Sequence, residues 1–133
     1  MKPFYIDTSA FYAYLVQNDR YHQPVATCLI SAVSEGRALF SSSLVLGEIL
    51  GLLEFRQGLE AASRFMTDVF PLVLWPWVDA PLFDSLWCLV REKQRRRLRL
   101  VDARAVVCIR ERPGSVCVAV DDDLRRFEFD VLP

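Results

Sequence analysis

The sequence predicts an α/β fold in which helices cover both faces of a central, mostly parallel sheet. Short apolar runs typical of strands alternate with longer, helix-like segments along the chain. This alternation favours parallel strands joined by right-handed crossovers. The chain has 133 residues, of which 53% are hydrophobic and 25% charged. We therefore expect a single domain, residues 1–133, with a sizeable buried core.

The individual elements follow from local composition and from residues that cap helices. Strands are expected at 3–6, 38–42, 72–75, 115–120 and 127–132, the last with the alternation of an edge strand. Helices are expected at 8–17, 22–35, 44–55, 58–68, 80–97 and 102–111. Thr8 and Ser9 can cap the first helix, the serines at 41–43 the third, and Asp79 the fifth.

Composition excludes several classes of protein. The longest uncharged apolar stretch, residues 69–78, contains two prolines and is too short to span a membrane. The N-terminal residues lack the pattern of a secretory signal. The four cysteines are scattered and there is a single histidine. These features predict reduced thiols in a cytoplasmic protein and argue against a zinc site.

Positive charge is concentrated in one segment. Residues 91–112 hold nine of the sixteen Lys and Arg residues but only three of the seventeen acidic residues. A basic segment on an otherwise acidic chain suggests a polyanion partner. The candidate contacts are Arg95, Arg96, Arg97, Arg99 and Arg104. The alternative is a solvated helix end whose cations interact favourably with the helix dipole.

Acidic residues follow two of the predicted strands. Asp7 comes after the strand at 3–6, and Asp121 comes after the strand at 115–120. Ligands of parallel sheets bind beyond the carboxyl ends of the strands, near a topological switch point. Both acids therefore stand where a binding site is expected. Each also has a simpler explanation, because Asp7 can cap the following helix and Asp121 can begin an exposed turn.

Two further acids raise the same choice. Glu48 is the only charged residue in the apolar stretch 44–53, and burying an unpaired carboxylate costs several kcal/mol. It needs a cation, hydrogen-bond donors or a route to solvent; the alternatives are a narrow exposed stripe on its helix or pairing with an arginine. Asp102 has the simpler explanation of an N-cap for the helix that follows it.

Together these acids form an oxygen-only set of candidate ligands, with no His or Cys nearby in the sequence. A few carboxylates with retained waters suit Mg²⁺ or Mn²⁺. Such a cation offsets the repulsion between carboxylates, activates water and stabilises the charge that builds up on a phosphate under attack. With a basic segment to hold a polyanion backbone, the set indicates metal-dependent hydrolysis of phosphodiester bonds.

Four stretches, in their order and spacing, resemble the PIN-domain nucleases: FYIDTSAFYAYL, SSLVLGEIL, LVDARAVVCI and VAVDDDLRRFEFDVL. Within that family the chain is most similar to the VapC-type toxins of prokaryotic toxin–antitoxin pairs. The resemblance spans essentially the whole chain and implies a three-layer α/β/α domain. It also implies Mg²⁺- or Mn²⁺-dependent endoribonuclease activity on RNA, inhibition by a cognate antitoxin protein, and a homodimer.

The resemblance also assigns roles by position. It implies that the catalytic and metal-binding pocket is formed by Asp7, Glu48, Asp102 and Asp121. Asp123 occupies the place of an assisting acid, and Ser9 is expected to orient the first carboxylate through its hydroxyl. The polyanion contacts proposed above become RNA contacts. The chain departs from the family pattern at Ala119, where threonine is common, and at Glu128, where glycine is common.

Two other functions fit parts of the sequence. Aspartate-based phosphotransfer domains also place acids at strand ends. Haloacid-dehalogenase-like phosphatases, however, have a second aspartate where Ser9 stands, and receiver domains need a late-strand lysine, whereas no lysine follows Lys93. A PIN-like scaffold that only binds RNA or protein usually lacks one or more of the acids, and none is missing here.

The aromatic segment 70–87 contains three tryptophans and two phenylalanines. Aromatic residues at this density are typical of a buried core, although interfaces are also enriched in them. The interface hypothesis is that part of this segment and the early helices form a dimer or antitoxin surface.

The three consecutive aspartates are not expected to be equivalent. If Asp121 faces the pocket at the end of a strand, alternation turns Asp122 away and returns Asp123 to the same side. We therefore predict that Asp121 and Asp123 belong to the pocket and that Asp122 is solvated.

Overall fold

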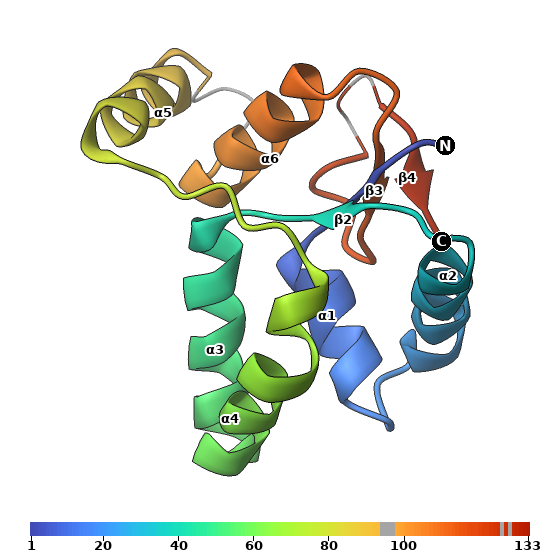
Figure 1. Ribbon diagram of the computed structural model, residues 1–133. Helices are drawn as coiled ribbons and strands as arrows, with labels where there is room; N and C mark the ends of the chain where they lie inside the picture. Colours follow the sequence, from blue (N-terminus) through green and yellow to red (C-terminus); the bar gives the residue numbers. More distant parts are fainter. Residues whose placement is uncertain (94–97, 126, 128) are drawn as a thin grey trace.

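A parallel sheet forms the centre of the molecule, and helices lie on both sides of it (Figure 1). The computed structural model describes residues 1–93, 98–125, 127 and 129–133. Within these ranges the strands are β1 (Phe4–Ile6), β2 (Leu39–Phe40), β3 (Val116–Val118) and β4 (Val131–Leu132), in the spatial order β2-β1-β3-β4. The pairings between them are parallel, which confirms the predicted α/β class.

The helices begin close to the predicted positions. They are α1 (Thr8–Leu15), α2 (His22–Ser34), α3 (Ser43–Gln57), α4 (Leu59–Asp68), the 3₁₀ helix η1 (Phe70–Leu72), α5 (Ala80–Glu92) and α6 (Leu100–Glu111). Ser42 caps α3 and Asp79 caps α5 through their side-chain oxygens. Gly58, at φ +96°, allows the chain to turn directly from α3 into α4. No helix among the described residues is long and apolar enough to cross a membrane.

Alternate residues of the strands point to opposite faces of the sheet and enter different cores. Phe4 and Ile6 of β1 pack with α1–α4, whereas Tyr5 of β1 and Cys117 of β3 pack with α6. Helix α5 packs against α6 through Leu86 and forms the outer part of that layer. The result is the expected three-layer arrangement, with α1–α4 on one face of the sheet and α6 with α5 on the other.

Several predicted strands are shorter in the structure. Leu74 makes only an isolated bridge to Phe40, so the segment 72–75 is not a full strand. The chain turns away there because the Trp75 side chain enters the core and Pro76 has no backbone N–H to continue a ladder. Likewise β3 ends at Val118, and β4, an edge strand as predicted, is reduced to Val131–Leu132.

The aromatic segment serves both the core and the surface. Trp75 stacks on Phe11 and Phe70 with ring centroids 5.6 Å apart in each pair, and Phe65 meets Phe11 edge-on at 5.4 Å. Trp77, by contrast, is 67% exposed. The expectation of a core role therefore holds for Trp75 but not for Trp77.

Replacement of Phe65 by alanine is expected to lower the free energy of unfolding by about 3–5 kcal/mol, because this ring is completely buried between two aromatic neighbours. Urea denaturation followed by circular dichroism measures the effect. Phe55, which is 89% exposed on α3, is the matched control, and its replacement should change stability by less than about 0.5 kcal/mol. Equal losses at the two positions would contradict this core.

Candidate functional site

Acidic side chains from four segments of the chain meet beyond the carboxyl ends of β1 and β3. Asp7 follows β1, Asp121 and Asp123 follow β3, Glu48 lies on α3 and Asp102 on α6. A cavity of about 360 Å³ opens at this edge and is lined by Ser9, Glu48, Arg99 and Asp121, among others. Because β1 and β3 are neighbours at the switch point of the sheet order, the topology itself brings Asp7 and Asp121 together.

Asp7 is held rigidly at the start of α1. Its side chain is buried, and one carboxylate oxygen accepts hydrogen bonds from the Ser9 hydroxyl at 2.9 Å and the Ser9 N–H at 3.4 Å. The Ser9 hydroxyl in turn accepts a hydrogen bond from the Val120 N–H at 3.1 Å. Ser9 therefore orients Asp7 and ties α1 to the segment after β3. Asp7, rather than Thr8 or Ser9, is the N-cap.

Asp102 is also buried, but it is not the N-cap of its helix. Helix α6 begins two residues earlier than predicted, at Leu100, so that Asp102 lies in the first turn. A single oxygen, Oδ2, accepts two hydrogen bonds, one from the Arg99 backbone N–H at 3.2 Å and one from the Arg99 Nε–H at 3.3 Å. Asp102 therefore closes the start of α6 from inside the helix.

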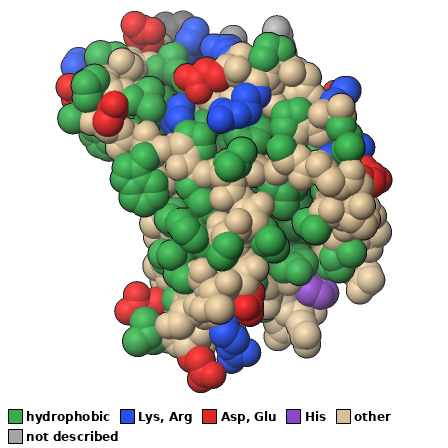
Figure 2. Space-filling view, viewed as in Figure 1, with side chains coloured by type: hydrophobic (Ala, Val, Ile, Leu, Met, Phe, Trp, Pro, Cys, Tyr) green, Lys and Arg blue, Asp and Glu red, His purple; other side chains and the backbone are tan. Residues whose placement is uncertain are grey.

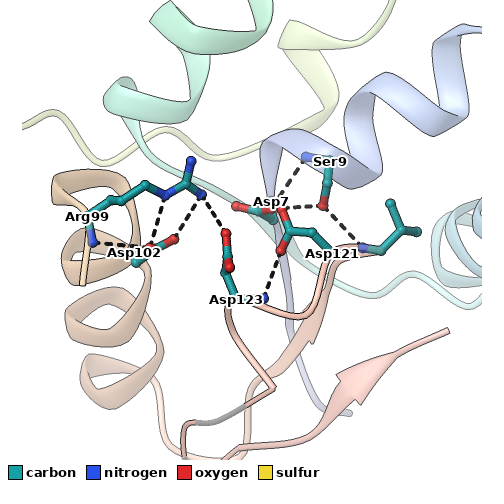
Figure 3. Close-up of polar contacts among 7 residues, drawn as sticks. Asp7, Ser9, Arg99, Asp102, Asp121 and Asp123 are labelled. Carbon is teal, nitrogen blue, oxygen red and sulfur yellow. Dashed lines mark hydrogen bonds and ion pairs between the residues drawn. The ribbon is translucent and has the colours of Figure 1, made fainter. Parts of the chain in front are cut away.

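Arg99 joins two of the acidic segments (Figure 3). Its Nη2 lies 3.5 Å from the second oxygen of Asp102 and 3.1 Å from the carboxylate of Asp123. Sequence reasoning placed Arg99 among the RNA contacts and missed that it is a counter-ion of the acids. The available signal was its spacing of three residues before Asp102, which allows an ion pair within one helical turn.

The three consecutive aspartates separate as expected, although for a different reason. The Asp122 side chain is 97% exposed and pairs with Arg125 at 3.6 Å, whereas Asp123 faces Arg99. Asp121 accepts a hydrogen bond from the Asp123 N–H at 3.3 Å. Strand alternation is not the cause, because β3 has already ended at Val118 and the aspartates lie in a turn. The turn itself sends Asp122 outwards.

The other predicted residues have varied outcomes. Glu48 is half-buried on α3 and lines the cavity. Arg104 is only 3% exposed and lies 3.8 Å from Glu111, so its side chain is not presented to RNA and we leave it out of the proposed contacts. Ala119 is completely buried. The predicted contacts at 95–97 and the departure at Glu128 lie outside the described residues.

Negative charge at this edge is only partly compensated. Burial, and next the nearby Asp121 carboxylate, raise the pKa of Asp7 from 3.8 to about 6. Burial and the neighbouring Asp123 also raise the pKa of Asp121. Among the described residues, the positive charge of Arg99 offsets the raised pKa of Asp121 only in part, and this is the condition that a bound cation would relieve.

The chemistry of this donor set fits a hard divalent cation such as Mg²⁺ or Mn²⁺, because every candidate ligand is a carboxylate. In the present arrangement, no group of three His, Cys, Asp or Glu side chains among the described residues is positioned to hold a metal ion. In this arrangement Arg99 pairs with two of the candidate ligands, Asp102 and Asp123.

Without metal, Asp7→Asn is expected to stabilise the protein at pH 7.5. The raised pKa means that the Asp7 carboxyl binds its proton more tightly in the folded state than in the unfolded state. The free energy of unfolding of the wild type therefore falls as the pH rises from about 4 to about 6. The amide of Asn does not ionise and avoids this loss. Relative to wild type, the free energy of unfolding of Asp7→Asn should be higher by up to roughly 3 kcal/mol at neutral pH, and the difference should vanish near pH 4.

Urea denaturation in EDTA at pH 7.5 and pH 4 measures this difference, with the exposed Asp122→Asn as control. A gain of equal size at both pH values would show that ionisation of Asp7 is not its source.

Comparison with known proteins identifies the family of this fold. The PIN domain family matches residues 4–130. The structure is similar to that of VapC20 from Mycobacterium tuberculosis, described as a sarcin-ricin loop cleaving toxin, with a TM-score of 0.83 and 25% identity over 98% of this chain and 99% of that chain. No curated protein sequence matches the chain.

Two assemblies share the fold at lower identity. VapBC2 from Rickettsia felis, bound to a DNA fragment from its promoter, has a TM-score of 0.67 and 10% identity, with 96% of each chain covered. DNA-bound VapBC from Salmonella typhimurium has a TM-score of 0.66 and 15% identity, with 98% of this chain and 97% of that chain covered. The resemblance inferred from the sequence motifs is confirmed: this chain belongs to the PIN domain family and is similar over its whole length to a VapC-type toxin.

Proposed function

We propose that residues 1–133 act as one catalytic unit, a Mg²⁺- or Mn²⁺-dependent endoribonuclease that serves as the toxin of a cytoplasmic toxin–antitoxin pair. The observation that carries the proposal is the acidic edge itself. Four segments converge on it, and Ser9 fixes the orientation of the buried Asp7. Membership of the PIN domain family and the similarity to a toxin that cleaves RNA support the same activity.

Each acid has a proposed role. The metal-holding residues are Asp7, Glu48, Asp102 and Asp121, with Asp123 assisting. A divalent cation in this pocket supplies Lewis-acid activation of water and stabilisation of charge on the phosphate. Ser9 lines the cavity and orients Asp7 by donating a hydrogen bond to its carboxylate. The half-exposed Arg99 lies at the rim, where its guanidinium can contact the RNA backbone once substrate is bound.

The proposed partner is an antitoxin, since two of the similar structures are VapBC assemblies. An apolar groove of about 470 Å³ runs between α1, α2 and η1 and is lined by Tyr14, Leu29, Ile30, Val33 and Leu72. Figure 2 shows hydrophobic side chains gathered across the middle of one face of the molecule, with charged side chains mainly at its two ends. We assign this groove to the antitoxin, and we propose that the toxin itself is a homodimer.

Asp7→Asn and Asp121→Asn are each expected to reduce RNA cleavage by at least about 100-fold, because even residues that only support metal ligands commonly contribute 10–100-fold. Asp122→Asn should retain most of the activity, since its side chain points into solvent. Cleavage of a labelled RNA containing the sarcin–ricin loop, with an unrelated hairpin for comparison, is followed in Mg²⁺, in Mn²⁺ and in EDTA.

Cleavage that is independent of metal, or equal in Asp7→Asn and wild type, would refute the nuclease proposal. Failure of the wild-type protein to bind Mn²⁺ in calorimetry would favour the non-catalytic scaffold instead. Equal losses at Asp121 and Asp122 would show that the turn after β3 is differently arranged in the active protein.

Ile30→Glu is expected to weaken the complex with the antitoxin at least tenfold, because it places a charge in the apolar groove, where Ile30 is 59% exposed. RNA cleavage should not change. The matched control is Leu59→Glu, at a 68% exposed position on α4 outside the groove. Calorimetry with the protein encoded by the neighbouring reading frame measures both. Equal weakening by the two variants would place the antitoxin elsewhere.

A further inference from the structure

We infer that Arg99 is a resident counter-cation of the acidic pocket and that a divalent metal ion displaces its guanidinium from Asp102 and Asp123. The inference rests on the proposed function, because it describes how metal enters the pocket. It assigns Arg99 a role in metal loading that is separate from any contact with RNA.

The first argument is that one guanidinium serves two carboxylates from different parts of the chain. Nε and Nη2 of Arg99 approach the two oxygens of Asp102, which is 1% exposed, and Nη2 also approaches Asp123, which follows β3. Figure 3 shows the guanidinium contacting Asp102 on one side and Asp123 on the other. The positive group therefore sits where carboxylates from both sides of the pocket can reach it.

The second argument is that the guanidinium and a metal ion compete for the same oxygen lone pairs. Among the described residues no three acidic side chains are arranged for a metal ion while Arg99 holds Asp102 and Asp123. A cation that approached Asp7 and Asp121 would also repel the nearby guanidinium. The pocket therefore cannot bind a metal ion through all its carboxylates while Arg99 stays paired with Asp102 and Asp123.

The third argument is that Arg99 can leave without loss of local structure. Its side chain is 56% exposed, and the outer contact, to Asp123, is an ion pair at the surface that is easily screened. The start of α6 is closed separately by the Arg99 backbone N–H, which donates to Asp102 at 3.2 Å. The side chain can therefore swing into solvent while the helix terminus and the Asp102 backbone stay in place.

The experiment measures Mn²⁺ affinity of the full chain by electron paramagnetic resonance, without substrate. Arg99→Gln should bind Mn²⁺ about tenfold more tightly than wild type if Arg99 occupies the pocket nine-tenths of the time. Arg99→Lys keeps the charge but lacks the planar fork that spans two carboxylates, and should bind with intermediate affinity.

The control is Arg64→Gln, which changes the net charge equally. Arg64 lies on α4 and does not line the cavity. Its side chain is 71% exposed, 3.6 Å from Glu60. Salt screens such an exposed charge, so the Mn²⁺ affinity of this variant should match that of wild type.

A second measurement uses unaltered protein. The Arg99 Nε–H signal in a ¹⁵N NMR spectrum, assigned by its loss in Arg99→Gln, should shift and exchange faster with water as Mg²⁺ is added. If wild type and Arg99→Gln bind Mn²⁺ equally well and the Arg99 signal does not move, the displacement of Arg99 by metal is refuted, but the nuclease proposal is left intact. Equal tightening in Arg64→Gln would also overturn it, as a general charge effect. Absence of Mn²⁺ binding in every variant would defeat both proposals.

Discussion

The repulsion between Asp7 and Asp121 is the constraint on which the rest of this site depends. Neighbouring parallel strands deliver their carboxyl ends to the same edge of the sheet, so an acid after β1 and an acid after β3 must face each other. Burial strengthens the interaction, because less water is available to screen it. The fold therefore maintains an arrangement of charge that is unfavourable in the absence of a cation.

The surrounding residues limit this cost without removing it. Ser9 donates to Asp7, and the turn after β3 lets Asp121 accept a hydrogen bond from the Asp123 N–H. Arg99 pairs with the buried Asp102 and with Asp123. None of these groups lies between Asp7 and Asp121 as a positive partner. A site that is destabilising when empty and stabilised by its ligand is a common consequence of selection for function. Here it explains why a small domain keeps five acids at one edge.

Much of the fold could be predicted from the sequence because alternation of strand-like and helix-like segments is a local signal. The positions of Asp7 and Asp121 followed from the same signal, since each comes directly after an apolar run. The predicted strand at 72–75 failed because apolar composition does not distinguish a strand from a segment whose Trp75 is drawn into the core. The boundary of α6 was missed because Asp102 resembles an N-cap but closes the helix from its first turn.

The charges were harder to predict than the acids. Arg99 and Arg104 looked alike as members of one basic segment, yet one bridges two carboxylates at the pocket and the other is buried beside Glu111. Arg99 stands just before α6, whereas Arg104 lies within the helix and is buried. Their surroundings therefore depend on how α6 packs in the folded chain. Such tertiary contacts leave little trace in a single sequence.

The central claim is that these acids form one metal site, and anomalous diffraction from a crystal soaked in Mn²⁺ tests it most directly. The account predicts a manganese peak at the edge of the sheet with Asp7 and Asp121 among its ligands, and the Arg99 guanidinium withdrawn from Asp102. A pocket without manganese at saturating concentration, with Arg99 still bridging Asp102 and Asp123, would contradict the account.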